Sequence, residues 1–243
     1  DTSECLMKFT IRELDDPAAR ECGRCSNCVG DLVPRNLPAE TVSRARQFLG
    51  QQWIDIEPRR QLPAGILPDR PRTIDQDKQV ELGLALCSYK DEDLGECVRA
   101  GKYEIGRFDD GLVIASVDAI RSKWTIDSTW WVVPVPSKRH PELVSDFAIR
   151  LAQQLGIDCV DAVTKFQNTA EQKTMENSFN QCQNVMRAFR ANSELVRSGP
   201  VLLVDDLVDS RWTLTVCGAV LRRAGSGPVH PFVLASQRKN DGI

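Results

Sequence analysis

Four of the nine cysteines stand close together in the first part of this 243-residue chain. Cys22, Cys25 and Cys28 are separated from one another by two residues each, and Cys5 precedes them by sixteen intervening residues. Four thiolates at this spacing suit the closed tetrahedral shell of a structural zinc ion. We therefore predict that Cys5, Cys22, Cys25 and Cys28 bind Zn²⁺, which would stabilise a segment too short to form its own core. An iron–sulfur cluster and four reduced cysteines without metal are the alternatives.

A second group of residues capable of chemistry lies in VLLVDDLVDSRWT, residues 201–213. Asp205 and Asp206 end a predicted strand, where two carboxylates can bind sugar hydroxyl groups directly or through Mg²⁺. A helix follows, so the backbone N–H groups from Ser210 to Thr213 would face a phosphate at a helix N-terminus, with the two hydroxyl groups as further donors. This order of strand, acidic pair, polar turn and helix predicts a site for a phosphorylated sugar.

The elements that must position this turn alternate between strand and helix across residues 126–243. Strands are predicted at WWVVPVP, VLLVDD and HPFVLAS, and amphipathic helices at ELVSDFAIRLAQQLG and LTVCGAVLRRAG. Strands joined by helices of this length imply right-handed crossovers and a parallel sheet, so the fold class is α/β. Ligands of such sheets bind at the carboxyl ends of the strands, where VPVPSKRH and DDLVDSRWT both fall.

The middle of the chain, residues 36–125, carries mainly helical patterns. Helices are predicted over 39–50, 79–90, 93–102 and 111–124, and a short strand at WIDIE. We expect three domains: a zinc module at 1–35, a small helical domain, winged-helix-like, at 36–125, and a parallel-sheet domain at 126–243.

Composition limits the possible partners only weakly. The net charge of -3 gives no general attraction to DNA or to anionic membranes, so any contact with nucleic acid must come from a local basic surface. The sequence has no apolar run of the length that spans a bilayer, and its first residues lack a signal-peptide pattern, which together predict a cytoplasmic protein without a membrane partner.

The cysteine pattern, with its turn ECGRCSNC, resembles the zinc module of RecQ-family DNA helicases. The resemblance implies an ATP-driven motor before the zinc module and a winged-helix domain that binds duplex DNA after it. The sequence lacks the phosphate-binding loop G-x-x-x-x-G-K-[ST], so we expect a C-terminal fragment whose partners are DNA and an absent ATP-using motor domain. Phosphate contacts would come from arginines of the middle part, for which a solvated face is the alternative: Arg44, Arg46, Arg59, Arg60, Arg70 and Arg72.

The turn VLLVDDLVDSRWT resembles the PRPP-binding motif of type I phosphoribosyltransferases, and residues 128–237 resemble their ComF-like branch. The resemblance implies that VPVPSKRHPEL is the pyrophosphate loop, with Lys138 and Arg139 neutralising pyrophosphate. It implies that Asp209 is a candidate catalytic base and that QKTMENSFNQCQNVMRAFR covers the site. PRPP with Mg²⁺ would be the ligand.

Arg211 departs from this family, which has glycine at the corresponding position. We expect glycine there because the chain passes close to the phosphate. The arginine could point outward and bind an anion, or it could fill the pocket and pair with Asp205, Asp206 or Asp209. We favour the second, in which Arg211 makes the site catalytically inactive.

Two functions of different class follow. The first is an accessory region of a RecQ-like helicase, with structural zinc, DNA binding and an inactive phosphoribosyltransferase-like domain. The second is an active, PRPP-dependent phosphoribosyltransferase fused to a helicase. A nucleotide sensor that modulates the motor is a third reading.

Overall fold

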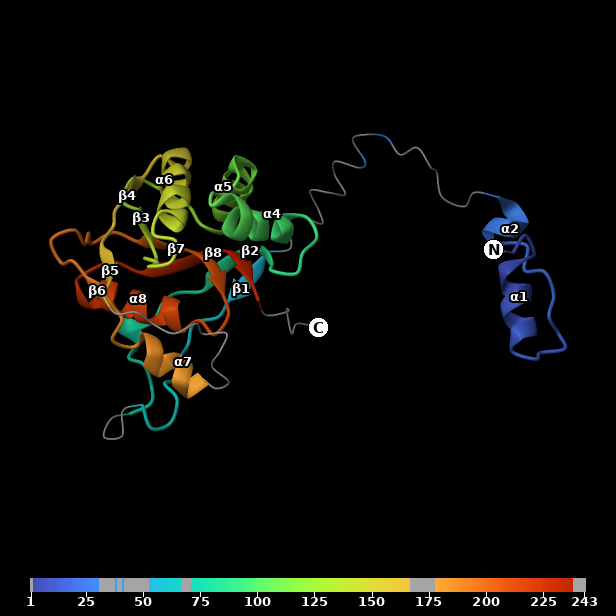
Figure 1. Cartoon of the computed structure of the whole chain (residues 1–243), viewed down its shortest axis with the longest axis horizontal. Coiled ribbons are helices and arrows are strands. Elements are labelled where there is room, and N and C mark those ends of the chain that lie inside the picture. The colour runs from blue at the N-terminus through green and yellow to red at the C-terminus, as the bar shows by residue number, and fades with distance from the viewer. Residues whose placement is uncertain are drawn as a thin grey trace. The chain divides into compact units, whose positions relative to one another are not determined.

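The structure is a computed structural model that describes residues 2–30, 38, 41, 53–66, 71–166 and 178–237. The chain divides into two compact units, Asp1–Gly50 and Gln51–Ile243 (Figure 1). In the described ranges, none of the helices combines the length and apolar character needed to cross a membrane.

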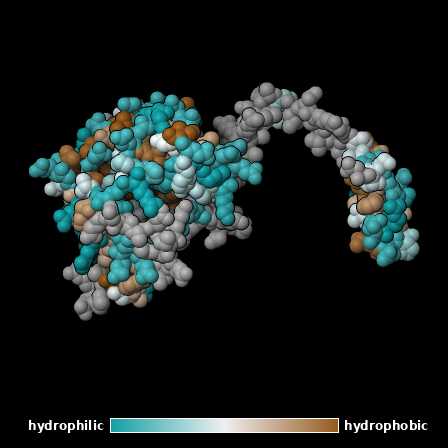
Figure 2. Space-filling view, in the orientation of Figure 1, coloured by the Kyte–Doolittle hydropathy of each residue, from teal (hydrophilic) through white to brown (hydrophobic). Residues whose placement is uncertain are grey.

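The N-terminal unit consists of two short helices, α1 (Leu6–Glu13) and α2 (Ser26–Val29). Helix α1 buries none of its side chains, and hydrophobic residues are visible on the surface of the unit (Figure 2). Among the described residues of this unit, Cys5 alone is buried, at 5% exposure. The described part of the unit therefore has no apolar core. Its stability must come from the cysteines, which can link its segments to one another.

The second unit is built on one six-stranded sheet in which all neighbours are parallel except one antiparallel pair at the edge. This confirms the predicted α/β class with a mainly parallel sheet. In spatial order the strands are β1 (Ile54–Ile56), β2 (Gly83–Ser88), β8 (Val229–Ser236), β7 (Val201–Val208), β3 (Trp131–Pro134) and β4 (Asp158–Cys159). A separate antiparallel pair consists of β5 (Val163–Lys165) and β6 (Phe189–Ala191).

Helices cover both faces of this sheet (Figure 1). Along β7, Leu202 and Val204 belong to one core cluster, and Val201 and Leu203 belong to the other, as alternation in a strand buried on both faces requires. The first core is covered by α4 (Leu94–Ala100), α5 (Asp110–Lys123) and α6 (Leu143–Leu155), and the second by α7 (Ser178–Val185) and α8 (Trp212–Arg223). The π-helix η2 (Gly101–Ile105) continues α4, and the 3₁₀ helix η1 (Gln76–Lys78) precedes β2.

The middle of the chain differs from the prediction. The helix predicted over 79–90 is wrong, because Gly83–Ser88 forms strand β2. Leu84 and Leu86 belong to one core cluster and Ala85 belongs to the other, so this short apolar run is buried on both faces of the sheet. The periodicity of such a run does not distinguish a strand from a helix.

Strands β1 and β2 join the same sheet as β3, β7 and β8, so the sheet crosses the boundary expected between residues 125 and 126. In place of a small helical domain, the described part of 36–125 supplies two strands, α4 and α5 to this unit. The helices predicted over 93–102 and 111–124 are confirmed by α4 and α5. The helix predicted over 39–50 lies outside the described residues, apart from position 41.

Candidate functional site

The predicted turn lies between β7 and α8, at the carboxyl edge of the sheet. Strand β7 includes Asp205 and Asp206, and α8 starts at Trp212, two residues earlier than expected. A pocket of ≈ 350 Å³ opens at this edge, where residues that follow β3, β7 and β8 meet. It brings together five of the predicted site residues: Arg139, Asp205, Asp206, Asp209 and Thr213.

Three predicted site residues, Lys138, Ser210 and Arg211, do not line this pocket. Lys138 is exposed and its Nζ donates a hydrogen bond to the carbonyl of Phe166 at 2.9 Å, so it is not part of the pocket lining. Ser210 is buried, at 2% exposure, and its carbonyl faces Arg59. Of the two residues expected to neutralise pyrophosphate, the pocket therefore contains Arg139.

The acidic pair has a cation that the sequence analysis missed. Lys102 Nζ lies 2.6 Å from Asp206 Oδ2, and the two side chains are only 18% and 13% exposed. Burial, together with the charge of Asp206, raises the pKa of Asp205 to about 8, although the Asp206 N–H donates to Asp205 Oδ1 at 2.9 Å. The site therefore disfavours two full negative charges side by side, and Lys102 is the cation in contact with Asp206.

Lys102 reaches the pocket from the π-helix η2, an unusual element that is often found at functional sites. A side chain at Gly101 would place its Cβ 2.8 Å from the ring of Phe108, so this close turn requires glycine. Tyr103, from the same element, is 55% exposed and also lines the pocket. Lys165 on β5 adds another cation, and burial lowers its pKa. In the sequence, the only indication that Lys102 belongs to the site was the pair Gly101-Lys102, which does not match a phosphate-binding loop.

Arg211 adopts a left-handed backbone conformation, with φ 67° and ψ 0°. Glycine would suit position 211 because the backbone there is left-handed. The sequence analysis had instead expected glycine because the chain passes close to the phosphate. The side chain does not line the pocket, and its Nη1 donates to the carbonyl of Glu57 at 2.9 Å. The expectation that Arg211 fills the pocket is therefore wrong, and the cation paired with Asp206 is Lys102.

Arg59 holds the same turn from outside. Its Nε donates to the carbonyl of Ser210 at 2.7 Å, and its guanidinium lies over the ring of Trp212 at 3.8 Å from the ring centroid. Trp212 is buried, at 1% exposure. Arg59 was predicted to contact DNA, and in the structure it instead contacts Ser210 and Trp212 in the turn between β7 and α8.

Of the other predicted DNA contacts, Arg44, Arg46 and Arg70 lie outside the described residues. Arg60 and Arg72 are exposed and stand on the paired segments that meet at the bridge between residues 61 and 73. The Leu62 N–H donates to the carbonyl of Arg72, and Arg72 Nε donates back to the carbonyl of Leu62 at 3.0 Å. These two arginines thus lie next to the antiparallel bridge between Gln61 and Thr73.

The N-terminal cysteines form the second candidate site. The Sγ atoms of Cys5, Cys22, Cys25 and Cys28 all lie within 4.8 Å of one another. Cys5 and Cys22 are 3.5 Å apart, as are Cys25 and Cys28. Sulfur atoms about 2.3 Å from one tetrahedral ion would be separated by about 3.8 Å, so the cluster could hold a zinc ion.

No protein-family model matches the sequence, and no curated protein matches it significantly. The chain is similar in structure to the allosteric regulatory enzyme of purine biosynthesis, with 21% identity over 50% of this chain and 24% of that one, at a TM-score of 0.33. With adenine phosphoribosyltransferase from Saccharomyces cerevisiae, the sequence identity is 14% over 53% of this chain and 70% of that one, and the TM-score is 0.34. With glutamine PRPP amidotransferase from B. subtilis, the sequence identity is 19% over 50% of this chain and 25% of that one, and the TM-score is 0.34. The chain thus spans about a quarter of the first and third proteins, and the chemistry of its pocket must be derived from its own residues.

The cysteine cluster predicts one zinc ion per chain. Cys25→Ser should lose the metal and unfold residues 2–30, because the described part of this unit has no apolar core, while residues 53–237 stay folded. Elemental analysis and hydrogen exchange measure the two effects. Cys97→Ser, which changes an exposed cysteine outside the cluster, is the control and should keep the metal. Iron in place of zinc, or a metal-free natural chain, would contradict the prediction.

The left-handed backbone at position 211 predicts an unusual order of stability. Arg211→Gly should be more stable than Arg211→Ala by about 1 kcal/mol in urea unfolding, because alanine keeps the cost of positive φ and glycine removes it. Asp118, an exposed residue in the interior of α5, is the matched control. There the order should reverse, with glycine less stable than alanine by about 1 kcal/mol. Equal stability of the two variants at 211 would show that the turn is not left-handed.

Proposed function

We propose that the second unit binds a phosphorylated ribose such as PRPP and does not transfer the phosphoribosyl group. The observation that carries this proposal is the ion pair of Lys102 and Asp206 in an open pocket. The pocket has a volume of ≈ 350 Å³. Its carboxyl groups could bind ribose hydroxyl groups, and the cations Arg139 and Lys165 could bind phosphate oxygens.

The phosphate would bind at the turn before α8. Arg59 fixes the carbonyl of Ser210, and in a trans peptide the next N–H points the opposite way, so the N–H of Arg211 points away from Arg59. Thr213 lines the pocket from the first turn of α8, where backbone N–H groups and the helix dipole favour an anion.

The acidic pair does not fit a divalent cation in this arrangement. Burial and the charge of Asp206 raise the pKa of Asp205, and Asp206 already has the ammonium group of Lys102 as its partner. A magnesium ion would have to displace Lys102 from a largely buried contact with Asp206. We therefore assign to Lys102 the charge balance that a metal would provide, and we infer binding without Mg²⁺. An active phosphoribosyltransferase is the alternative, and it requires Lys102 to leave Asp206.

For the N-terminal unit we propose a structural zinc module within a longer RecQ-like helicase, which would supply the ATP-driven motor. The four clustered thiols support the zinc part of this proposal. DNA contact would then involve Arg60 and Arg72, since both are exposed, whereas Arg59 is engaged with Ser210 and Trp212.

Lys102 predicts how PRPP binding responds to magnesium. By calorimetry the natural chain should bind PRPP equally well with Mg²⁺ and with EDTA. Lys102→Ala should bind at least about tenfold more weakly in EDTA, because Asp206 then faces the phosphates unbalanced, and Mg²⁺ should restore binding.

Lys90→Ala, which removes an exposed lysine outside the pocket lining, is the charge control and should change nothing. Failure of PRPP to bind under both conditions would refute the site. Release of pyrophosphate from PRPP with adenine, guanine, hypoxanthine, uracil or orotate would refute the inactive assignment and support the transferase.

The exposure of Arg60 and Arg72 predicts moderate, sequence-independent DNA binding. Arg60→Ala combined with Arg72→Ala should weaken binding to a duplex and lower the slope of log affinity against log salt, because fewer phosphates are neutralised. Fluorescence anisotropy over a salt series measures both. Arg121→Ala, on α5, is the control. Unchanged binding in the double variant would place the DNA surface elsewhere.

A further inference from the structure

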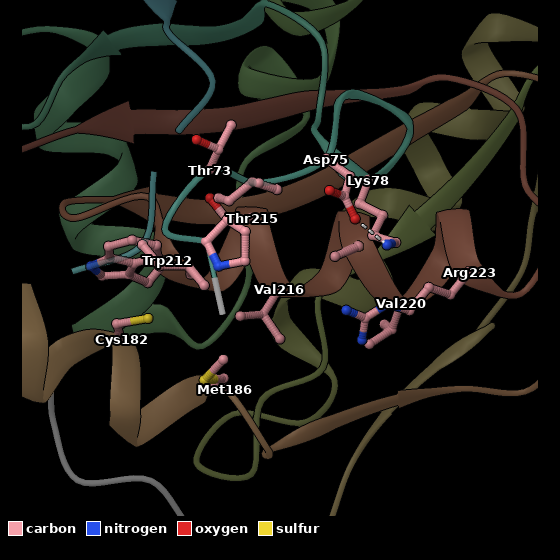
Figure 3. A pocket seen from close by; sticks show the side chains of 14 residues that line it. Thr73, Asp75, Lys78, Cys182, Met186, Trp212, Thr215, Val216, Val220 and Arg223 are labelled. Atoms are coloured by element: carbon pink, nitrogen blue, oxygen red, sulfur yellow. Dashed lines mark hydrogen bonds and ion pairs between the residues drawn. The ribbon is translucent and has the colours of Figure 1, made fainter. Parts of the chain in front are cut away.

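A second pocket, of ≈ 250 Å³, lies along one side of α8 (Figure 3). Helix α8 forms one wall, α7 and the residue after it form another with Cys182 and Met186, and the segment around η1 forms the third. Neither the acidic pair nor the cations of the first pocket line it. It is thus a cavity that the proposed sugar-phosphate site does not use.

The pocket is elongated along the helix. Its residues on α8 recur at intervals of three and four and therefore share one face: Trp212, Thr215, Val216, Ala219, Val220 and Arg223. From Trp212 to Arg223 the helix rises by about 16 Å, at about 1.5 Å per residue. Figure 3 shows Trp212 at one end and Arg223 at the other, with Val216 between them.

The middle of the pocket and its Trp212 end are mainly apolar. Val216 and Val220 face the cavity from α8, and Met186 lies across from them (Figure 3). Burial raises the pKa of Cys182 to about 11, so its thiol is neutral and adds to the apolar wall. This surface favours a hydrocarbon chain.

The other end of the pocket is charged. Lys78 pairs with Asp75, as the dashed line in Figure 3 shows, and Arg223 stands near them and helps lower the pKa of Asp75. Two cations against one carboxylate leave one positive charge among the lining residues at this end. A single negative charge on a ligand would complement it.

We propose that this pocket binds a small apolar monocarboxylate, with its chain along α8 towards Trp212 and its carboxylate between Lys78 and Arg223. The cavity is smaller than the range of about 300 to 1,000 Å³ that drug-sized ligands occupy, which favours a chain of few carbons. Binding here is independent of the proposed sugar-phosphate site, because none of the catalytic candidates lines this pocket.

Calorimetry with butanoate, hexanoate and octanoate on the full chain tests the proposal. Affinity should rise by about fourfold for each added CH₂ until the cavity is full. Hexan-1-ol should bind more weakly than hexanoate, because it lacks the charge. No detectable binding of any of the three acids, or equal affinity for all of them, would overturn the proposal.

Charge variants locate the carboxylate. Arg223→Gln should weaken hexanoate binding several-fold, and Asp75→Asn should strengthen it, whereas Arg121→Gln on the opposite helix layer should have no effect. Both tested side chains are exposed, so folding should be unaffected. Ala219→Phe, which fills the cavity, should abolish binding while the melting temperature confirms folding. Unchanged affinity in both Arg223→Gln and Asp75→Asn would show that the acids bind elsewhere.

Discussion

The contact of Arg59 with Ser210 and Trp212 is the constraint on which the site depends. A charge-assisted hydrogen bond of this kind contributes about 1.5 to 3 kcal/mol, and a guanidinium over tryptophan adds about 0.5 to 2 kcal/mol. The contact joins the segment after β1, at the edge of the sheet, to the turn after β7 near its centre. Strand β7 carries the acidic pair and α8 carries Thr213, so one arginine fixes the turn that sets their relative positions.

The same contact links the two pockets. Trp212 supports Arg59 with its ring and also closes one end of the second pocket. Thr215, a lining residue of that pocket, donates from Oγ1 to the carbonyl of Arg211 at 2.9 Å. The next residue after Trp212, Thr213, lines the first pocket. Trp212 and Thr213, consecutive residues of α8, thus line different pockets.

Local patterns predicted the parts of the structure that local forces determine. The apolar runs of β3, β7 and β8 and the cysteine spacing were sufficient to predict a parallel sheet, its turn and a cluster of four thiols. Strand β2 was missed because a short apolar run buried on both faces has no period of its own. Lys102 and Arg59 were missed as site residues because their partners, Asp206 and Ser210, are more than a hundred positions away and only the folded sheet brings them together.

The arginine at position 211 shows why a departure from a motif must be interpreted through the backbone. The sequence suggested that a side chain there would enter the pocket, but with φ at 67° the chain directs the guanidinium to the carbonyl of Glu57, and the pocket remains open. An arginine in this left-handed conformation costs about 1 to 2 kcal/mol in backbone energy, which the hydrogen bond to the carbonyl of Glu57 partly offsets. An arginine at this position therefore leaves the pocket open. The cation in contact with the acidic pair is instead Lys102, whose Nζ lies 2.6 Å from Asp206 Oδ2.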